Sequence, residues 1–531
     1  MVKLRAKNII QRFGNAAIWL YSVRIITVGA FLFCTFIALR YIHQPLADSH
    51  AFRQTQTALT AYWMLQEGWK LAYETPVAGY PWSIPFEFPI YQALVAAIAA
   101  ISGFHLEAVG RFVSYVFLIA IAWPAYAITR RLRLPNTVAW VFCALLWASP
   151  LNVYWGRTFM IETAAVFFSF ACLPYAIDVI RCVGRSRSVL LFLVFASAAV
   201  LQKATTGGPV LLFLLLAVMF VSIRRNGLSF QTFRQAFYPS VVICVPLVIG
   251  LGWAHYADIV KMANPFGAQL TSNTLKLWNL GTVQQRLDLE TWRLVVWERS
   301  FNWNAGGAVG VSLLLLPWAG GGDRRFTWLS IAALALFLLP ILIFTNLHIV
   351  HEYYQVGCVA FLLVALAIVI GGWLSKVTGM VVLVPIVTLA IILSNSALFI
   401  KSYGIVAART LDELDPRSVQ AYKVGRYLRD HTPPGSGLVV FGQGYSSEIA
   451  YQAQRKTMAA APWFVEYRRL WEQPQQYLGD VQLSAIILCP PTDEFPTIQD
   501  LRGRLDNESG WRHVTVNGCE LLLSPAAEGS N

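Results

Sequence analysis

Long apolar blocks alternate with short basic clusters along most of the chain, as in TGMVVLVPIVTLAIILS between Lys376 and Lys401. The blocks run for about 17 to 22 residues, the length that an α-helix needs to cross hydrocarbon at about 1.5 Å per residue. This pattern predicts a polytopic α-helical membrane protein. The predicted spans lie at about 24–41, 110–129, 136–154, 160–180, 188–202, 207–222, 238–256, 305–319, 326–345, 354–373 and 378–399.

Clusters of Lys and Arg set the predicted topology. Cytoplasmic loops of membrane proteins carry an excess of these residues, so neighbouring clusters must be separated by an even number of spans. About eleven spans satisfy this rule, with the N-terminus in the cytoplasm and the C-terminus outside. The count requires that residues 89–103, a short apolar stretch beginning at Pro89, lie along or dip into the outer surface instead of crossing.

The composition supports a membrane protein and argues against a nucleic-acid partner. Hydrophobic residues make up 56% and charged residues 13% of the chain. The net charge of +13 is spread over the turns between apolar blocks, which fits anionic lipid headgroups and insertion topology. No small-residue cleavage site follows the basic N-terminus, so we expect the first apolar block to remain as a span.

The chain becomes polar beyond about residue 405. Helical patterns alternate there with short apolar runs such as GLVVFG and SAIILC, an order that predicts a small α/β domain at 405–531 after a membrane domain at 1–404. Within the membrane domain we expect a first external loop at 42–109. A second external loop at 257–304 is expected to include an interfacial amphipathic helix.

Two local features of the predicted α/β domain have roles that stay open. FGQGYSSE at 441–448 predicts a strand, a glycine turn and a Ser-capped helix, which either holds a phosphate or is only a tight turn. Cys489 and Cys519 either form a disulfide or remain buried thiols. We see no catalytic constellation in this domain and expect it to act as an accessory lid or as a docking unit.

Ionisable residues gather on the predicted outer side of the membrane, although the chain has only 28 acids among 531 residues. A charge close to hydrocarbon is costly, so such residues usually serve a function. The asymmetry favours chemistry at the outer leaflet over transport, for which ionisable groups near mid-bilayer would be expected. The outer side includes Asp48, Arg53, Glu87, Arg157, Glu162, Lys203, His348, His351, Glu352, Tyr353 and Tyr354.

Three motifs follow one another along the membrane half of the chain. Asp48 follows the first span, FEFP stands at 86–89, and GRTFMIE stands at 156–162. In this order the membrane half resembles glycosyltransferase family 39, whose members have the GT-C fold and include protein O-mannosyltransferases and the lipid A aminoarabinose transferase. HEYY at 351–354 and YSSEIAYQAQRK at 445–456 resemble motifs of bacterial members whose acceptor is unassigned.

The resemblance implies sugar transfer from a polyprenyl-phosphate donor, with Asp48 as the general base. A carboxylate can take the proton of an acceptor hydroxyl while cations and hydrogen-bond donors hold the departing phosphate. An Asp placed ahead of the predicted helix AFRQTQTALTAYWMLQ would also satisfy free N–H groups at the helix N-terminus. The two roles do not exclude each other.

Glu87 occupies the position of the family's acidic residue that helps to bind the acceptor or a divalent metal. The family's Lys after this Glu is replaced by Phe88, so the phosphate must be neutralised by other cations. Arg53, Lys203 and His351 are available for this role. A divalent metal held by Glu87 and His351 is a further alternative, although neither HExxH nor CxxC spacing supports it.

Glu162 and Arg157 match the family's GR-type turn, where an acidic residue positions the substrate. The two residues either contact the acceptor or form a structural ion pair. Lys203, in a turn similar to the family's KGP turn, either binds the donor phosphate or extends to the interface. Tyr353 and Tyr354 correspond to a Tyr pair that meets the carrier phosphate in the family, and phenol groups are suitable donors for it.

We therefore predict a glycosyltransferase of the bacterial inner membrane that moves a hexose or pentose from undecaprenyl phosphate to a glycan, lipid or protein acceptor outside the cytoplasm. The first alternative is a non-catalytic carrier or flippase of polyprenyl-linked glycans, which would need a polar path across the bilayer. The second is a scaffold whose external domain docks an envelope-assembly partner. The sequence leaves the sugar, the acceptor and the anomeric outcome open.

Overall fold

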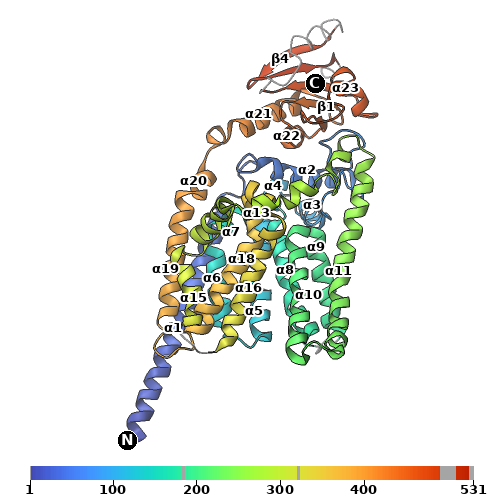
Figure 1. Cartoon of the computed structure of the whole chain (residues 1–531). Helices are drawn as coiled ribbons and strands as arrows, with labels where there is room; N and C mark the ends of the chain where they lie inside the picture. Colours follow the sequence, from blue (N-terminus) through green and yellow to red (C-terminus); the bar gives the residue numbers. More distant parts are fainter. Residues whose placement is uncertain (1, 182–185, 320–322, 491–509, 526–531) are drawn as a thin grey trace. The chain divides into compact units, whose positions relative to one another are not determined.

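The computed structural model describes residues 2–181, 186–319, 323–490 and 510–525 (Figure 1). The chain divides into two compact units, each assembled from three segments. The helical unit comprises Met1–Ile42, Arg111–Leu251 and Lys276–Ile405. The α/β unit comprises His43–Gly110, Gly252–Leu275 and Val406–Asn531. The region around Asp48 therefore folds with the C-terminal part of the chain.

Long apolar helices dominate the helical unit, and Figure 1 shows them running side by side. In hydrocarbon the backbone must satisfy its own hydrogen bonds, which a continuous helix does. Eight helices in the described residues are long and apolar enough to cross a membrane. They are Ile18–Arg40 in α1 (Val2–Arg40), Leu106–Arg131 in α4 (Leu106–Ala120) and α5 (Ala122–Arg131), α8 (Glu162–Ile180), α10 (Ala204–Asn226), α11 (Phe230–Met262), α16 (Arg324–Ile343), Glu352–Leu374, and α19 (Leu383–Lys401).

Three further predicted spans coincide with shorter apolar helices, which are α6 (Thr137–Ala148), α9 (Ser186–Gln202) and α15 (Ala308–Ala319). Each falls short of the roughly 20 residues of an untilted span. The stretch expected not to cross forms α3 (Ile90–Ser102), which has 13 residues. The polytopic helical class is confirmed, whereas the count of about eleven spans and the orientation of the termini stay predictions.

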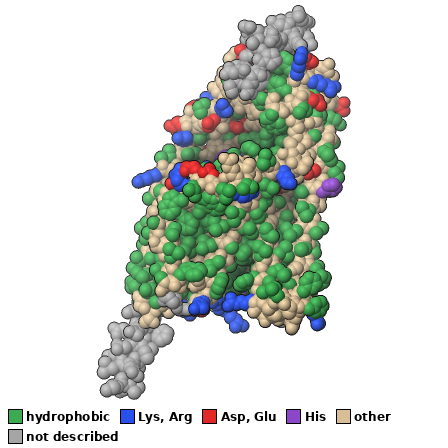
Figure 2. Space-filling model, viewed as in Figure 1, with side chains coloured by type: hydrophobic (Ala, Val, Ile, Leu, Met, Phe, Trp, Pro, Cys, Tyr) green, Lys and Arg blue, Asp and Glu red, His purple; other side chains and the backbone are tan. Residues whose placement is uncertain are grey.

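The span formed by η3 (Glu352–Tyr354), α18 (Gln355–Ala367) and η4 (Ile368–Leu374) is the most enclosed, with 94% of its apolar window buried. Helices α6, α8 and α16 pack against it. Gly371 permits a close approach there, because a Cβ would lie 2.8 Å from the backbone of Thr137. Exposed apolar side chains cover the outer faces of the surrounding helices, and Figure 2 shows them as a broad hydrophobic surface. Lipid would cover this surface in a membrane.

Short helices complete the helical unit at the ends of the long ones. Such breaks are tolerated where the backbone is buried in protein or lies outside the hydrocarbon region. The segment Arg293–Asn302 is π-helical, a form that often marks functional regions. The short helices are α7 (Pro150–Trp155), α12 (Lys276–Leu280), α13 (Val283–Leu287), α14 (Leu289–Trp292), η2 (Arg293–Asn302), α17 (Thr345–Val350) and α20 (Tyr403–Ala408).

A five-stranded mixed sheet in the order β2-β1-β3-β5-β4 forms the centre of the α/β unit. β1 (Gly437–Phe441) pairs parallel with β2 (Lys456–Ala459) and β3 (Leu483–Leu488). β5 (Cys519–Leu523) pairs antiparallel with β3 and with β4 (Arg512–Val516). β1 and β3 are buried apolar runs, as parallel strands usually are. The sheet confirms the predicted small C-terminal α/β domain.

Helices from distant parts of the sequence accompany this sheet. Helix α21 packs on α22, and α22 also packs on α2 from the first external loop. A Cβ at Gly425 in α21 would lie 2.5 Å from the Cβ of Gln452, so the two helices touch where that glycine lies. The helices are α2 (Ala51–Glu67), α3, η1 (Gly267–Leu270), η5 (Leu411–Glu413), α21 (Pro416–His431), α22 (Glu448–Ala453), α23 (Tyr467–Glu472) and η6 (Pro474–Tyr477).

A segment of the first external loop extends the edge of the sheet at β2. The amides of Thr457 and Ala459 donate to the carbonyls of Pro76 and Val77, at 3.1 and 2.8 Å. The amide of Gly79 donates in turn to the carbonyl of Thr457 at 3.1 Å. Asn264 Nδ2 donates to the carbonyl of Gly79 at 2.9 Å and so ties the third segment of the unit to the same strand-like stretch. These bonds cover the exposed edge of β2.

Cys489 and Cys519 form a disulfide, which decides an alternative that the sequence left open. The bridge joins the end of β3 to the start of β5 across a sequence separation of 30 residues. A covalent link of this length lowers the conformational entropy of the unfolded chain. The other cysteines in the described residues that remain free lie in helices of the helical unit.

Loss of this disulfide should destabilise the α/β unit. We expect a Cys489→Ser/Cys519→Ser variant to lose roughly 3–4 kcal/mol, the chain-entropy value for a loop of about 30 residues. Limited proteolysis of the full chain in detergent, followed with temperature, measures the effect. Cys244→Ser, which removes a free thiol from α11, is the matched control and should leave the cleavage temperature unchanged. Equal cleavage temperatures for the double variant and the unsubstituted protein would refute the stabilising role.

Candidate functional site

Asp48 is held by a glutamine one turn into the following helix. Its side chain is 3% exposed, and its Oδ1 accepts a hydrogen bond of 2.5 Å from Gln54 Nε2. Gln54 Nε2 also donates to the carbonyl of Ser49 at 3.0 Å. The N-cap residue of α2 is His50, in the left-handed conformation at φ 53°, and not Asp48. Such backbone conformations in residues other than glycine concentrate at functional sites.

Glu87 finds its counter-ion in Arg53 on the first turn of α2. Arg53 Nη2 lies 2.5 Å from Glu87 Oε1, and Arg53 Nη1 donates to Gln56 Oε1 at 2.5 Å. The two charged side chains are 14% and 21% exposed, so the pair is largely shielded from water. A carboxylate among the aromatic side chains of the FEFP segment needs such a partner. Arg53, one of the cations expected at the phosphate, therefore neutralises Glu87 in this structure.

Aromatic side chains fix the turn that carries Glu87. The hydroxyl of Tyr73 donates to the carbonyl of Glu87 at 2.8 Å and accepts from the amide of Phe86 at 2.7 Å. Trp253 Nε1 donates to the carbonyl of Phe86 at 3.0 Å. Burial raises the pKa of Tyr73, which keeps its hydroxyl protonated and able to donate.

The C-terminal motif YSSE supports the start of α2. Ser447 Oγ donates to the carbonyl of Phe52 at 2.8 Å and lies 2.9 Å from Thr55 Oγ1. The ring of Tyr445 meets that of Phe52 edge to face, with centroids 5.3 Å apart. FGQGYSSE thus forms a turn that orients the segment carrying Asp48 and Arg53, and its phosphate-binding role stays a prediction. The serine contacts with α2 could not be foreseen, because 392 residues separate Thr55 from Ser447.

A second polar cluster lies in the helical unit, around a buried ion pair. Lys203 Nζ, between α9 and α10, lies 2.6 Å from Glu162 Oε1 at the start of α8, and the two side chains are only 3% and 2% exposed. Lys203 Nζ also lies 3.9 Å from the ring centroid of Tyr354 and 5.2 Å from that of Tyr353. The ammonium group therefore meets a carboxylate and two aromatic faces, both of which stabilise a desolvated cation.

Arg157 lies against aromatic rings at the end of α7. Its guanidinium is 4.6 Å from the ring centroid of Tyr154 and 5.4 Å from that of Tyr41. The carbonyl of Arg157 accepts from Arg111 Nη1 at 3.2 Å. The buried partner of Glu162 is Lys203, 41 residues away, a pairing that the sequence analysis did not foresee.

His351 and His348 flank the Tyr pair without forming a metal site. The ring of His351 stacks on that of Tyr353, with centroids 5.2 Å apart. Burial, assisted by the charges of Lys203 and Arg299, lowers the pKa of His348 from 6.5 to about 3. Among the described residues no group of three or more His, Cys, Asp or Glu could hold a metal ion. The residues present therefore do not fit the metal alternative for Glu87 and His351.

Arg299 anchors the Tyr-pair segment from the π-helical stretch. Its Nη1 donates to the carbonyls of His348 and Ile349, at 2.9 and 3.0 Å. Gln355 Nε2 donates to the carbonyl of His348 as well, at 3.1 Å. Three hydrogen bonds thus hold the backbone of His348 and Ile349, in the segment that leads to Tyr353 and Tyr354. No motif in the sequence identified Arg299 as a supporting residue.

Comparisons with known proteins are informative through structure alone. No protein-family model matches the chain, and no curated protein matches it in sequence. Among solved structures, ArnT from Cupriavidus metallidurans bound to undecaprenyl phosphate matches at 13% identity with a TM-score of 0.56, covering 94% of this chain and 98% of that chain. The oligosaccharyltransferase AglB from Archaeoglobus fulgidus, in complex with an inhibitory peptide and a dolichol-phosphate, matches at 12% identity and 0.52, covering 94% and 74%.

The arabinofuranosyltransferase AftD from Mycobacteria also matches, at 12% identity and a TM-score of 0.53, covering 94% of this chain and 39% of that chain. All three similarities extend over nearly the whole of the present chain. The chain has the GT-C fold. At these identities the comparisons establish the GT-C architecture and leave the roles of individual residues to geometry and chemistry.

The predicted site residues fall into two groups, one in each unit. Asp48, Arg53 and Glu87 are brought together around the first turn of α2 in the α/β unit. Lys203, Glu162, Tyr353 and Tyr354 form the cluster in the helical unit, with His351 and Arg157 on the neighbouring aromatic side chains. Sequence reasoning missed Gln54, Arg299 and the supporting role of Ser447. Gln54 had a usable signal, because it ends the run FRQ at 52–54, only six residues after Asp48.

Breaking the buried ion pair of the helical unit should cost more than removing both of its charges. We expect Lys203→Met alone to lose about 3–5 kcal/mol, because it leaves a buried carboxylate without its counter-ion. Lys203→Met/Glu162→Gln should recover most of that loss. Thermal unfolding in detergent compares the stability of the unsubstituted protein, the single variant and the double variant. Lys376→Met, which alters an exposed lysine, is the control. A single variant as stable as this control would contradict the structural role of the pair.

The neutral state of His348 predicts acid sensitivity. Its pKa of about 3 in the folded protein lies below the ordinary 6.5, so the unfolded chain binds more protons between these values. The associated stability is present above pH 6.5 and is lost as the pH falls towards 3, with about 2 kcal/mol lost at pH 5. His348→Gln should flatten this part of the stability profile measured by thermal unfolding. If the variant and the unsubstituted protein lose the same stability at low pH, His348 is not the source of the acid sensitivity.

Proposed function

We propose that this chain is an integral membrane glycosyltransferase that moves a sugar from a polyprenyl-phosphate donor to an acceptor on the outer side of the bacterial inner membrane. The observation that carries the proposal is the GT-C fold over 94% of the chain, shared with an ArnT structure bound to undecaprenyl phosphate. The two polar clusters of the present chain contain the chemical groups that this reaction needs. In this proposal the N-terminus lies in the cytoplasm and the α/β unit lies outside it.

Asp48 serves as the general base in this proposal. Its carboxylate takes the proton of the acceptor hydroxyl while that oxygen bonds to the anomeric carbon of the sugar. The bond between the anomeric carbon and the phosphate oxygen breaks, and polyprenyl phosphate leaves with its electron pair. Burial and the hydrogen bond from Gln54 restrict the rotamers of the carboxylate and so orient it before substrate binds. Glu87, kept in place by Arg53, is assigned to the acceptor side.

Lys203, Tyr353 and Tyr354 are assigned to the donor phosphate. An ammonium group and phenol hydroxyls stabilise the negative charge that develops on the leaving group. Glu162 holds Lys203 in place at 2.6 Å, and the Tyr rings limit the directions in which its ammonium group can point. His351 stacks behind Tyr353 and supports the same face. Arg157 is assigned to the substrates as a further cation, whereas Arg53 acts through Glu87, which it neutralises.

The stretch 276–297 is assigned to the membrane surface near the lipid carrier. Its short helices expose large apolar side chains, among them Leu277 at 67%, Leu287 at 76% and Leu289 at 83%. Trp278 and Trp297 in the same stretch are about half and two-fifths exposed, and Trp favours the headgroup region. Exposed apolar residues that alternate with Arg and Glu are typical of helices that lie in the interface. This supports the predicted amphipathic surface segment.

Asp48→Asn tests the proposed chemistry. The assay follows the transfer of a radiolabelled hexose or pentose from undecaprenyl phosphate into bacterial envelope acceptors. We expect this transfer to fall by about 10²–10⁴-fold in the variant, the usual effect of losing a general base. The matched control is Asp412→Asn, which alters a carboxylate in the same unit whose side chain is 76% exposed. Size-exclusion profiles verify that both variants fold. Undiminished transfer by Asp48→Asn would refute the base assignment, and no transfer by the unsubstituted protein would refute the activity.

A further inference from the structure

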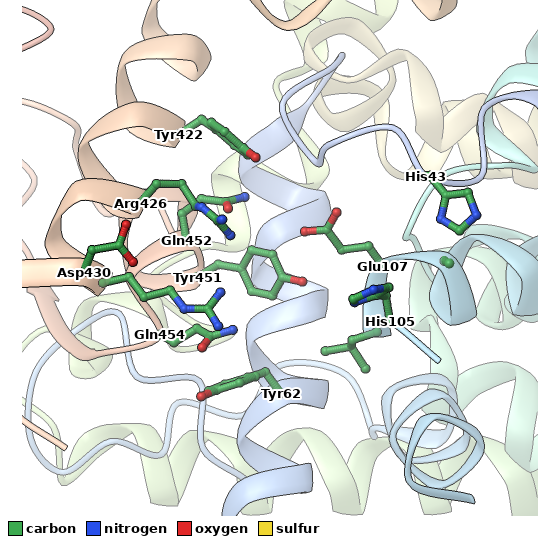
Figure 3. Close-up of a pocket in the computed structure, with 13 residues that line it drawn as sticks. His43, Tyr62, His105, Glu107, Tyr422, Arg426, Asp430, Tyr451, Gln452 and Gln454 are labelled. Atoms are coloured by element: carbon green, nitrogen blue, oxygen red, sulfur yellow. The ribbon is translucent and has the colours of Figure 1, made fainter. Parts of the chain in front are cut away.

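A polar cavity of about 680 Å³ lies within the α/β unit, apart from the residues assigned to catalysis (Figure 3). Its size is within the roughly 300–1,000 Å³ of small-molecule sites. Figure 3 shows Tyr451 pointing across the cavity towards the wall that carries Glu107 and His105. Only Leu106 and Ala108 contribute aliphatic side chains to the lining. The cavity therefore suits a polar ligand and not a lipid chain.

Planar hydrogen-bonding groups and phenol rings make up most of the lining. Arg426 and Arg429 from α21 supply forked donors, and Glu107 together with Asp430 supplies paired acceptors. Gln452 and Gln454 add both donors and acceptors. The positive and negative charges balance, so the cavity does not attract an anion by charge alone. Tyr62, Tyr422 and Tyr451 provide rings with an apolar face and a polar edge.

The cavity wall is fixed by a buried arginine behind it. Arg455 is 5% exposed, and its Nη2 donates to the carbonyls of Arg429 and Thr432, at 3.1 and 2.5 Å. Its Nη1 donates to the carbonyl of Ala453 at 3.0 Å. These bonds tie the end of α21 to the end of α22. The polar groups between these two helix ends are therefore arranged before any ligand arrives.

Gln454 reaches the cavity from a constrained backbone. It adopts the left-handed conformation at φ 54°, which residues other than glycine rarely accept. A glycine would remove this cost but would also remove the amide from the cavity lining. Gln454 is also the C-cap residue of α22, and a residue other than glycine in this conformation supports a functional hypothesis for its side chain.

We infer that this cavity binds a saccharide unit of the acceptor. Forked Arg groups, carboxylates and amides can each form two hydrogen bonds with neighbouring sugar hydroxyls, and Tyr rings can pack on the apolar face of a pyranose. The inference rests on the proposed transfer function, for which it supplies an acceptor-docking site in the same unit as Asp48. It also assigns a saccharide-bearing acceptor among the glycan, lipid and protein classes.

The geometry of α2 bears on the size of that acceptor. Tyr62 in the cavity lies eleven residues after Ala51, the first residue of α2, so about 16 Å of helix separates them. Asp48 precedes Ala51. An acceptor that contacts Tyr62 and also places a hydroxyl at Asp48 would therefore be an oligosaccharide or a longer glycan.

The test is direct binding of maltotriose and chitotriose to the full chain in nanodiscs, observed by saturation-transfer difference NMR. We expect at least one trisaccharide to bind and Arg426→Ala/Arg429→Ala to weaken it at least tenfold. The matched control Arg417→Ala/Lys423→Ala removes two positive charges from exposed positions on α21 that do not line the cavity. Its binding should equal that of the unsubstituted protein. No binding of either trisaccharide, or equal binding by the Arg426/Arg429 variant, would overturn the inference.

A charge-preserving variant separates a saccharide site from an anion site. Arg426→Lys/Arg429→Lys keeps both positive charges but loses the forked donors, so it should also lose saccharide binding. Full retention of binding by this variant, or tighter binding of inorganic phosphate than of either trisaccharide, would contradict the inference.

Donor turnover distinguishes failure of this inference from failure of the proposed function. Release of labelled sugar from undecaprenyl-phosphate sugars without acceptor should be unchanged in the Arg426→Ala/Arg429→Ala variant, because no donor group is altered. Transfer by this variant should instead show a raised acceptor KM at unchanged kcat. Trisaccharide binding without any donor turnover would support the cavity and refute the transferase. Donor turnover without trisaccharide binding would support the transferase and refute the saccharide site.

Discussion

Charges buried in largely apolar surroundings must be neutralised locally, and this constraint organises both units of the molecule. Desolvating a carboxylate or an ammonium group costs several kcal/mol, so each buried charge needs a partner. Lys203 and Glu162 satisfy each other in the helical unit, and Arg53 and Glu87 do so in the α/β unit. Both pairs join segments that are far apart in sequence. The other polar groups of each cluster are arranged around its ion pair.

Pairing also determines how much charge each cluster can offer to a substrate. A cation already matched by a carboxylate carries no surplus charge, so it binds a phosphate by sharing its hydrogen bonds, assisted by neutral donors. The hydroxyl groups of the Tyr rings around Lys203 suit this arrangement. The cavity between α21 and α22, with its balanced charges, suits a neutral polyhydroxylated molecule. Under the proposed function, the two clusters and the cavity would offer different chemistry to donor and acceptor.

The sequence predicted those features that depend on composition and local pattern. Apolar blocks of sufficient length located the long helices, and the change to a polar, alternating pattern located the sheet, because both signals follow from backbone geometry and burial. It could not pair Lys203 with Glu162, since Arg157 stands nearer in the chain and has the same sign of charge. The strand-like bonding of residues 76–79 to β2 was also hidden, because so short a segment shows no periodicity.

Binding of the lipid carrier is the most direct test of the account. Native mass spectrometry of the purified protein should show one undecaprenyl phosphate bound per chain, at least tenfold more tightly than undecaprenol. The phosphate is the group that the Lys203 cluster is proposed to hold, so Lys203→Met/Glu162→Gln should reduce this preference. Equal binding of the phosphorylated and unphosphorylated lipids by the unsubstituted protein would contradict the account.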